Sequence, residues 1–192
     1  MNRREALQRA GLVLGYAISA PVLAGIMNGC KTTEELAYKP QFFTEDQARL
    51  VGEVAEIFIP KTDTPGAKEV GVPRFIDQLL KECYKKEDQD RFLAGLKAFD
   101  EDAEKTYGDS FMELDLAKQE EHVKKVHDAA LDAKKKGEVK QPPFILMTKE
   151  LTVVGFFTSE TGATKVLQYE AVPGAYRGCV PLAEVGKTWA TS

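Results

Sequence analysis

Two histidines are the first residues to consider for catalysis or metal binding. His122 and His127 are five residues apart, in a stretch whose apolar residues recur at helical spacing. Five residues turn a side chain by about 140° around a helix, so the two imidazoles point in different directions. Helical zinc sites instead place two histidines four residues apart. The spacing therefore favours two solvated surface histidines and predicts no metal site in this chain.

Two cysteines are the next candidates. Cys83 and Cys179 are far apart in the sequence and lack the CxxC spacing of zinc and iron–sulfur sites. In an oxidising compartment they could form a disulfide. They could equally be two buried free thiols, because free cysteine behaves as a small apolar residue. The sequence favours neither interpretation.

A short polar segment, Thr62-Asp63-Thr64-Pro65-Gly66, gathers two hydroxyls and a carboxylate. Asp and Thr side chains in turn-forming sequences commonly bond their own backbone, so we interpret the segment as a structural turn. A hydrolase or oxidoreductase that uses Asp63 with Thr62 or Thr64 is the alternative. The sequence has no CxxCH haem motif, no GxGxxG and no P-loop. We therefore expect this chain to contain no catalytic residue and to bind no cofactor.

Apolar residues at helical spacing, bounded by capping and breaking residues, predict an all-α fold. Thr44 and Gln47 fit a capping box that starts the first helix, and Pro60 ends it. Further helices are predicted from Val72, after the charged break 85–90 as far as Gly108, over Leu114–Lys136, over Phe144–Phe157 and, as a short helix, near Ala163–Leu167. An irregular, extended C-terminal arm follows. The prediction is a single domain of about five or six helices, without the alternating pattern of strands.

Two of these helices have distinctive apolar faces. The segment Phe144–Phe157 is apolar on nearly every side. A helix of this kind is buried, either in its own domain or against another protein. The helix before it has a heavily charged outer face, and its predicted inner stripe consists of Leu116, Val123, Val126 and Ala130.

The first 30 residues are predicted to be an export signal. Arg3 and Arg4 form an adjacent arginine pair, and Gly11–Met27 carries no charge. That length suits a signal better than a membrane span. The uncharged run leads to Cys30 through a lipobox-like sequence from which only Asn28 departs, so we expect a twin-arginine signal with lipid attached at Cys30. A cleaved signal without lipid and an uncleaved anchor are the alternatives.

Charge limits the classes of partner. The net charge is −4 at pH 7, and removal of residues 1–29 makes it about −6. Such a domain would be repelled by the phosphates of nucleic acid, so no nucleic acid partner is expected. Residues 31–40 are mostly polar and are predicted to form a tether to the helical domain, residues 41–192. We expect the exported chain in the periplasm, anchored by its lipid to a membrane.

Three ordered motifs carry a resemblance to a known family. They are IFIPKTDTPGA at residues 57–67 with GVPRFID at 71–77, KELTVVGFFTSE at 149–160, and YEAVPGAYRGCVPL at 169–182. Together they resemble the gluconate 2-dehydrogenase subunit 3 family, which includes the small (gamma) subunits of bacterial FAD-dependent sugar dehydrogenases. The resemblance covers nearly all of the chain after the signal.

The resemblance implies an accessory role. Small subunits of this family hold no flavin and bind a large FAD-dependent flavoprotein of the glucose–methanol–choline oxidoreductase type, which usually lacks its own signal. The twin-arginine signal of the small subunit then carries the folded pair across the membrane, and a cytochrome c subunit often takes the electrons. The chain would thus be a non-catalytic subunit and export escort of a periplasmic sugar or polyol dehydrogenase. A stand-alone envelope lipoprotein that binds a ligand or a protein is the alternative.

Aromatic side chains are the expected contacts with the flavoprotein, because large obligate interfaces bury apolar and aromatic residues. The alternative for each is ordinary packing in the chain's own core. Phe156 and Phe157 are adjacent in one helix, so at least one of them should point away from that core. The candidates are Phe144, Phe156, Phe157, Tyr169, Tyr176 and Trp189.

Overall fold

The computed structural model describes residues 36–172, 174–175 and 177–190. The expected signal at residues 1–30, residues 31–35 of the expected tether and Tyr176 lie outside these described residues. The helices are α2 (Glu45–Phe58), α3 (Val72–Cys83), α4 (Lys86–Tyr107), η1 (Phe111–Glu113), α5 (Leu116–Lys135), α6 (Phe144–Thr158), η2 (Gly162–Val166) and α7 (Leu182–Val185).

The predicted all-α fold is confirmed for the described part of the chain, which contains helices and no strand. One isolated parallel bridge between Gln168 and Trp189 joins two points of the C-terminal arm. The predicted short helix near Ala163–Leu167 is η2, a five-residue π-helix. Within the same described residues, we find no helix with the length and apolar character needed to cross a bilayer.

Local sequence signals account for the helix ends. The Thr44 hydroxyl accepts a hydrogen bond from the Gln47 N–H, and the Gln47 side chain accepts one from the Thr44 N–H at 3.0 Å, which confirms the predicted capping box of α2. Gly108, with a φ of 88°, ends α4 in the left-handed conformation that glycine adopts readily. Pro73 lies in the first turn of α3, where its missing N–H removes no helical hydrogen bond.

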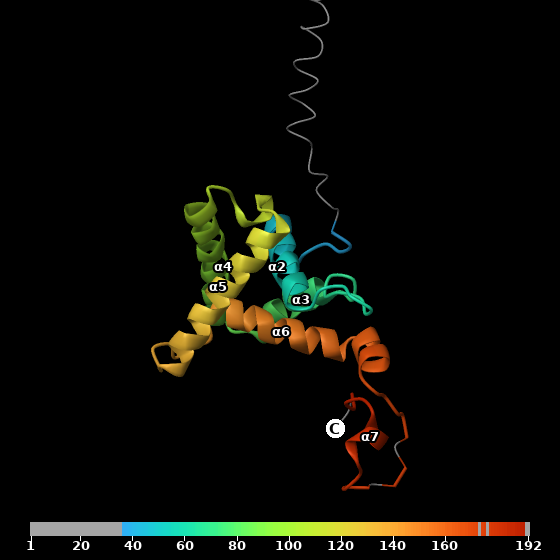
Figure 1. The fold of residues 1–192 in the computed structure, drawn as a ribbon. Helices are drawn as coiled ribbons and strands as arrows, with labels where there is room; N and C mark the ends of the chain where they lie inside the picture. The colour runs from blue at the N-terminus through green and yellow to red at the C-terminus, as the bar shows by residue number, and fades with distance from the viewer. Residues whose placement is uncertain (1–35, 173, 176, 191–192) are drawn as a thin grey trace, which may run out of the picture. The chain divides into compact units, whose positions relative to one another are not determined.

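Helix α6 lies at the centre of the core. It packs against α2, α3, α4 and α5, and Figure 1 shows it in orange, crossing the other long helices. Two glycines allow its close approach to its neighbours. A Cβ on Gly95 of α4 would lie 2.5 Å from the Phe144 Cβ, and a Cβ on Gly155 of α6 would lie 2.6 Å from the Phe75 ring. The absence of these two side chains therefore sets how near α4 and α3 come to α6.

Aromatic rings fill the space between α4 and the start of α6. The Phe144 ring packs edge-on against Phe92, with centroids 5.0 Å apart, and lies 5.6 Å from Phe99. Such edge-on and tilted arrangements are the favourable ones for aromatic pairs. The buried residues of α6 are Phe144, Ile145, Leu146, Met147, Thr148, Leu151, Thr152, Gly155 and Phe156. The expectation that this helix is buried is thereby confirmed.

The inner face of α5 differs from the predicted stripe. Leu116, the first residue of the helix, is 62% exposed. The buried residues are Gln119, His122 and Val123. Packing starts one turn after Leu116, where the Gln119 side-chain amide donates to the Phe111 carbonyl at 2.9 Å. The first turn of α5 therefore extends past the elements that would cover it, and the prediction of Leu116 in the core is wrong.

A buried carboxylate fastens the segment before α2 to α3. Asp77 has no exposed surface. Its two oxygens accept hydrogen bonds from three consecutive backbone N–H groups, at 2.8 Å from Gln41, 3.0 Å from Phe42 and 2.9 Å from Phe43. These bonds satisfy a charge that would be costly to bury alone. The nearby Tyr38 hydroxyl is also enclosed, and burial, followed by the charge of Asp77, raises its pKa.

Candidate partner-binding site

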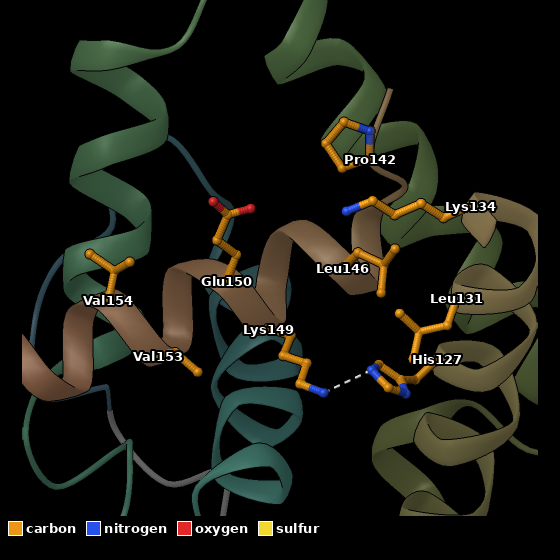
Figure 2. A pocket seen from close by; sticks show the side chains of 9 residues that line it. All are labelled: His127, Leu131, Lys134, Pro142, Leu146, Lys149, Glu150, Val153 and Val154. Carbon is orange, nitrogen blue, oxygen red and sulfur yellow. Dashed lines mark hydrogen bonds between the residues drawn. The ribbon is translucent and has the colours of Figure 1, made fainter. Parts of the chain in front are cut away.

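An open groove of about 360 Å³ lies between α5 and α6. Gly137, with a φ of 73°, follows α5 and lets the chain turn back towards α6. The two helices supply facing walls, and Figure 2 shows their side chains. The lining residues are His127, Leu131 and Lys134 of α5, Pro142 of the connection, and Leu146, Lys149, Glu150, Val153 and Val154 of α6. Apolar walls with a few polar groups are typical of binding sites.

The part of α6 at this groove is apolar and exposed. Val153 is 40% exposed and Val154 is 43% exposed, although the opposite side of the helix is buried in the core. These two adjacent valines and the other apolar side chains that line the groove form a continuous apolar surface. Surfaces of this kind on a soluble domain mark sites of interaction more often than single exposed apolar residues do.

A polar contact crosses the groove. Lys149 and His127 point towards each other in Figure 2, with 2.9 Å between Nζ and Nε2. The His127 Nδ1 lies 3.1 Å from the Asp128 Oδ1. A carboxylate only accepts hydrogen bonds, so Nδ1 carries the imidazole hydrogen and Nε2 accepts from Lys149. The Phe58 ring lies 6.0 Å from the imidazole and 5.9 Å from the Lys149 Nζ, which holds both groups in place.

Two further charges lie on the rim of the groove. Neither Lys134 of α5 nor Glu150 of α6 forms an ion pair with another described residue. The charge of Glu150 nevertheless acts on Tyr84 at the end of α3. Burial raises the pKa of the Tyr84 hydroxyl, and the Glu150 carboxylate adds to the rise. The groove therefore has the cation Lys134 on its α5 side, and the cation Lys149 and the carboxylate Glu150 on its α6 side.

The structure places the predicted aromatic contacts in different environments. Phe144 is 4% exposed and Phe156 is 1% exposed, so both belong to the chain's own core and neither is offered to a partner. Phe157 is half-buried and lies against Phe156, with ring centroids 5.2 Å apart. One of the two adjacent phenylalanines thus points away from the core. The exposed apolar residues of α6 are instead the valines, which reasoning from aromatic enrichment missed.

Backbone hydrogen bonds join the start of the C-terminal arm to its end, so that the arm forms a closed loop. The Gln168 N–H donates to the Thr188 carbonyl, and the Ala190 N–H donates to the Gln168 carbonyl, each at 2.8 Å. Trp189, one of the aromatic candidates, is half-buried within this closure. Tyr169 is exposed, as is the nearby Val172. The arm therefore presents Tyr169 on its surface, while Tyr176 lies outside the described residues.

The prediction of two solvated histidines is wrong for His122. Its imidazole has no exposed surface, its Nε2 donates to the Phe99 carbonyl at 3.0 Å, and its ring centroid lies 4.5 Å from that of Phe99. Tyr107 and Phe111 pack around the same ring. Aromatic residues of α4 and η1 enclose His122, and no local pattern in α5 could reveal this tertiary contact. His127 is half-buried in the groove.

The segment Thr62–Gly66 forms a turn, and a side chain from outside the segment stabilises it. The Thr62 N–H donates to the Thr64 carbonyl at 2.9 Å, and Asp63 is exposed. The carboxylate that organises the loop comes from Glu56 of α2, which accepts from the Lys61 N–H at 3.2 Å and from the Lys68 N–H at 2.8 Å. A Cβ on Gly66 would collide with that carboxylate. The loop therefore packs tightly on α2.

The cysteines and acidic residues form no metal site in the described part of the chain. Cys83 and Cys179 are both exposed and are not bonded to each other. The interpretation as two buried thiols is therefore wrong, because Cys83 is the last residue of α3 and lies on its outer side. The described residues contain no group of three or more His, Cys, Asp or Glu side chains that could hold a metal ion.

Comparison with known proteins places the chain in a family. Neither the curated proteins nor the solved structures contain a significant match to it. The sequence pattern described as gluconate 2-dehydrogenase subunit 3 matches residues 45–174, which is about two thirds of the chain and includes α2 to α6 and the whole groove. The motifs noted in the sequence fall largely within this range. The chain belongs to the gluconate 2-dehydrogenase subunit 3 family, and so to a family of subunits of a multi-subunit dehydrogenase.

Proposed function

We propose that this chain is the non-catalytic small subunit and export escort of a flavin-dependent sugar or polyol dehydrogenase. The catalytic partner is a large flavoprotein of the glucose–methanol–choline type, which holds the FAD, and a cytochrome c subunit is a further partner. The observation that carries the proposal is the family match over residues 45–174. It spans every long helix that builds the core and the groove.

The geometry of the groove supports a binding role rather than catalysis. Its lining contains no serine, threonine or cysteine that could act as a nucleophile. The His127 Nε2, which would act as a general base, already accepts a hydrogen bond from Lys149. The exposed Val153 and Val154 add apolar area to the wall of the groove. Interfaces between permanent partners bury such apolar surface. We therefore assign the groove and these two valines to contact with the flavoprotein.

The N-terminal sequence supports the escort role. Arg3 and Arg4 have the arrangement of a twin-arginine signal. A flavoprotein must fold around its FAD before export, and the twin-arginine route accepts folded cargo, so a partner bound to this chain would cross the membrane with it. Lipid at Cys30 would then hold the complex at a membrane on the periplasmic side.

Purification of the tagged chain from its native envelope tests the proposal. In mild detergent, the chain is expected to bring down one large protein in similar amount, and the complex should show flavin absorbance and sugar-dependent dye reduction. Val153→Asp with Val154→Asp should lower the recovered flavoprotein at least about tenfold, because two carboxylates would have to lose water at an apolar interface.

The control is Leu116→Asp, which introduces one carboxylate at another exposed apolar residue, away from the groove. This variant should recover as much flavoprotein as the unmodified chain. Recovery of the chain alone, with the dehydrogenase purified intact without it, would contradict the proposal and favour a stand-alone envelope lipoprotein. Turnover of a sugar by the chain itself, with no flavoprotein present, would also contradict it.

A further inference from the structure

The ammonium group of Lys149 is half-buried without an opposite charge. Its hydrogen-bond partner is the neutral acceptor Nε2 of His127, at 2.9 Å. Its other close neighbour is the Phe58 ring, with the centroid 5.9 Å from Nζ. None of the ion pairs within the described residues includes Lys149. A partly desolvated cation without a counter-charge is unfavourable, and binding of an anion would relieve that cost.

The imidazole of His127 contacts both Lys149 and a neighbouring carboxylate of α5. The Asp128 Oδ1 accepts from the His127 Nδ1 at 3.1 Å, and the Asp128 side chain is 58% exposed. The Asp128 carboxylate therefore bonds the histidine and forms no ion pair with Lys149. The same arrangement fixes the orientation of the ring and keeps Nε2 as the acceptor for Lys149. Two of the three ammonium hydrogens of Lys149 stay free for a bound group.

The walls around this cation limit what can bind. Lys134 on the opposite wall adds a second positive charge, and it forms no ion pair within the described residues. Leu131, Leu146 and Val153 make the rest of the wall apolar. Glu150, which also lines the groove, repels anions and so limits the negative charge that a bound segment can carry. The groove therefore fits an apolar segment with one carboxylate, rather than a highly charged ligand.

We propose that the groove receives an apolar segment of the partner flavoprotein that carries a single Asp or Glu, and that Lys149 pairs with this carboxylate. The inference rests on the proposed function, and it names the chemistry of the segment that the subunit binds. Val153 and Val154, the exposed valines already assigned to the flavoprotein, line the same groove as Lys149. A second copy of this chain fits less well, because two acidic chains of net charge −4 repel each other.

The test measures the affinity of the flavoprotein subunit, purified from the native complex, for variants of this chain. Lys149→Glu should raise the Kd at least about thirtyfold, as expected when one partner of a buried charge pair is reversed. Lys149→Arg keeps the charge and should stay within about threefold of the unmodified chain. Lys124→Glu, at an exposed lysine of the same helix as His127, makes the same charge change outside the groove and should bind normally.

Salt dependence separates the charge pair from a purely structural role. Lys149→Gln should weaken binding about tenfold and should also reduce the dependence of the Kd on salt concentration, because a screened charge pair has been removed. Thermal unfolding of each variant checks that the fold persists. If Lys149→Glu fails to fold, the affinity and salt dependence of Lys149→Gln decide whether Lys149 forms the charge pair.

Four outcomes are distinguishable. If the unmodified chain does not bind the flavoprotein, the proposed function fails. If it binds and Lys149→Glu binds equally well, the proposed function stands and the pairing at Lys149 is refuted. The pairing is also refuted if Lys149→Gln weakens binding with no change in salt dependence. Loss of self-association in Lys149→Glu, with unchanged binding of the flavoprotein, would identify a second copy of the chain as the occupant and would overturn the inference.

Discussion

Two polar groups, the Tyr38 hydroxyl and the Asp77 carboxylate, are buried near the start of the helical unit. They differ in whether they form hydrogen bonds within the described residues. The Asp77 carboxylate is satisfied by three backbone N–H groups. The Tyr38 hydroxyl is buried without a hydrogen-bond partner within the described residues. A buried hydroxyl without a hydrogen bond loses its bonds to water on folding and gains none in the protein. It therefore destabilises the folded chain.

The raised pKa of Tyr38 predicts a loss of stability at alkaline pH. Folding raises this pKa above the ordinary value of 10.0, chiefly by burial and then by the charge of Asp77. The contribution to stability is fully present below about pH 10 and is lost as pH rises further, because only the unfolded chain then releases the proton. The free energy of unfolding, measured with urea, should fall less between about pH 8 and about pH 11 for Tyr38→Phe than for the unmodified chain.

The matched control for this prediction is Tyr169→Phe, at an exposed tyrosine, which should keep the full loss of stability. At neutral pH, Tyr38→Phe should be as stable as the unmodified chain or slightly more stable, because it removes an unsatisfied hydroxyl. An equal alkaline loss in Tyr38→Phe and in the unmodified chain would contradict the account of Tyr38.

Some residue-scale properties could not be predicted from the sequence. The environment of His122 depends on Phe99, Tyr107 and Phe111, which belong to other elements and surround it only in the folded chain. The imidazole of His127 accepts a hydrogen bond from Lys149, which is 22 residues away in the sequence. Spacing along one helix carried no information on what each histidine would contact.

At the scale of elements, the helices were predictable because their signals are local. The capping box at Thr44 and the glycine at 108 fix helix ends through contacts within a few residues. The all-round apolar character of Phe144–Thr158 correctly indicated a buried helix. Leu116 was misplaced because periodicity gives the direction of a face and not how far the neighbouring elements extend over it.

The close packing of α4 on α6 predicts opposite effects for two glycine substitutions. An alanine in a helix is ordinarily more stable than a glycine by about 0.5 to 1 kcal/mol. At Gly95 the added Cβ would lie 2.5 Å from the Phe144 Cβ, so Gly95→Ala should lower the free energy of unfolding by about 1 to 2 kcal/mol. At Gly52 the nearest atom, Pro73 Cγ, is at 3.4 Å, so Gly52→Ala should be neutral or stabilising.

Urea unfolding of the two variants checks this prediction, and each serves as the control of the other. Both substitutions lie inside helices, so the intrinsic preference for alanine is the same in each. If Gly95→Ala were as stable as Gly52→Ala, the approach of α4 to α6 would be looser than the structure shows.

At the scale of the whole molecule, the candidate site was only partly predictable. The sequence indicated that the segment Phe144–Phe157 has more apolar surface than one core needs, and part of it is exposed at Val153 and Val154. It did not indicate the groove, because the groove depends on how α5 and α6 are spaced in the folded chain. It also favoured Phe144 and Phe156 as contacts, because composition cannot tell an aromatic anchor of an interface from one of the core.

The central claim is that one signal exports two proteins, and a change in this chain alone tests it most directly. Arg3→Lys with Arg4→Lys keeps the charge of the N-terminus but removes the arginine pair. The measurement is the flavin-dependent dehydrogenase activity of periplasmic and cytoplasmic fractions, with Arg9→Lys as the control for a basic residue outside the pair. The account predicts that the double substitution lowers periplasmic activity at least about tenfold and leaves the flavoprotein in the cytoplasm, while Arg9→Lys has little effect. Unchanged periplasmic activity after the double substitution would contradict the account.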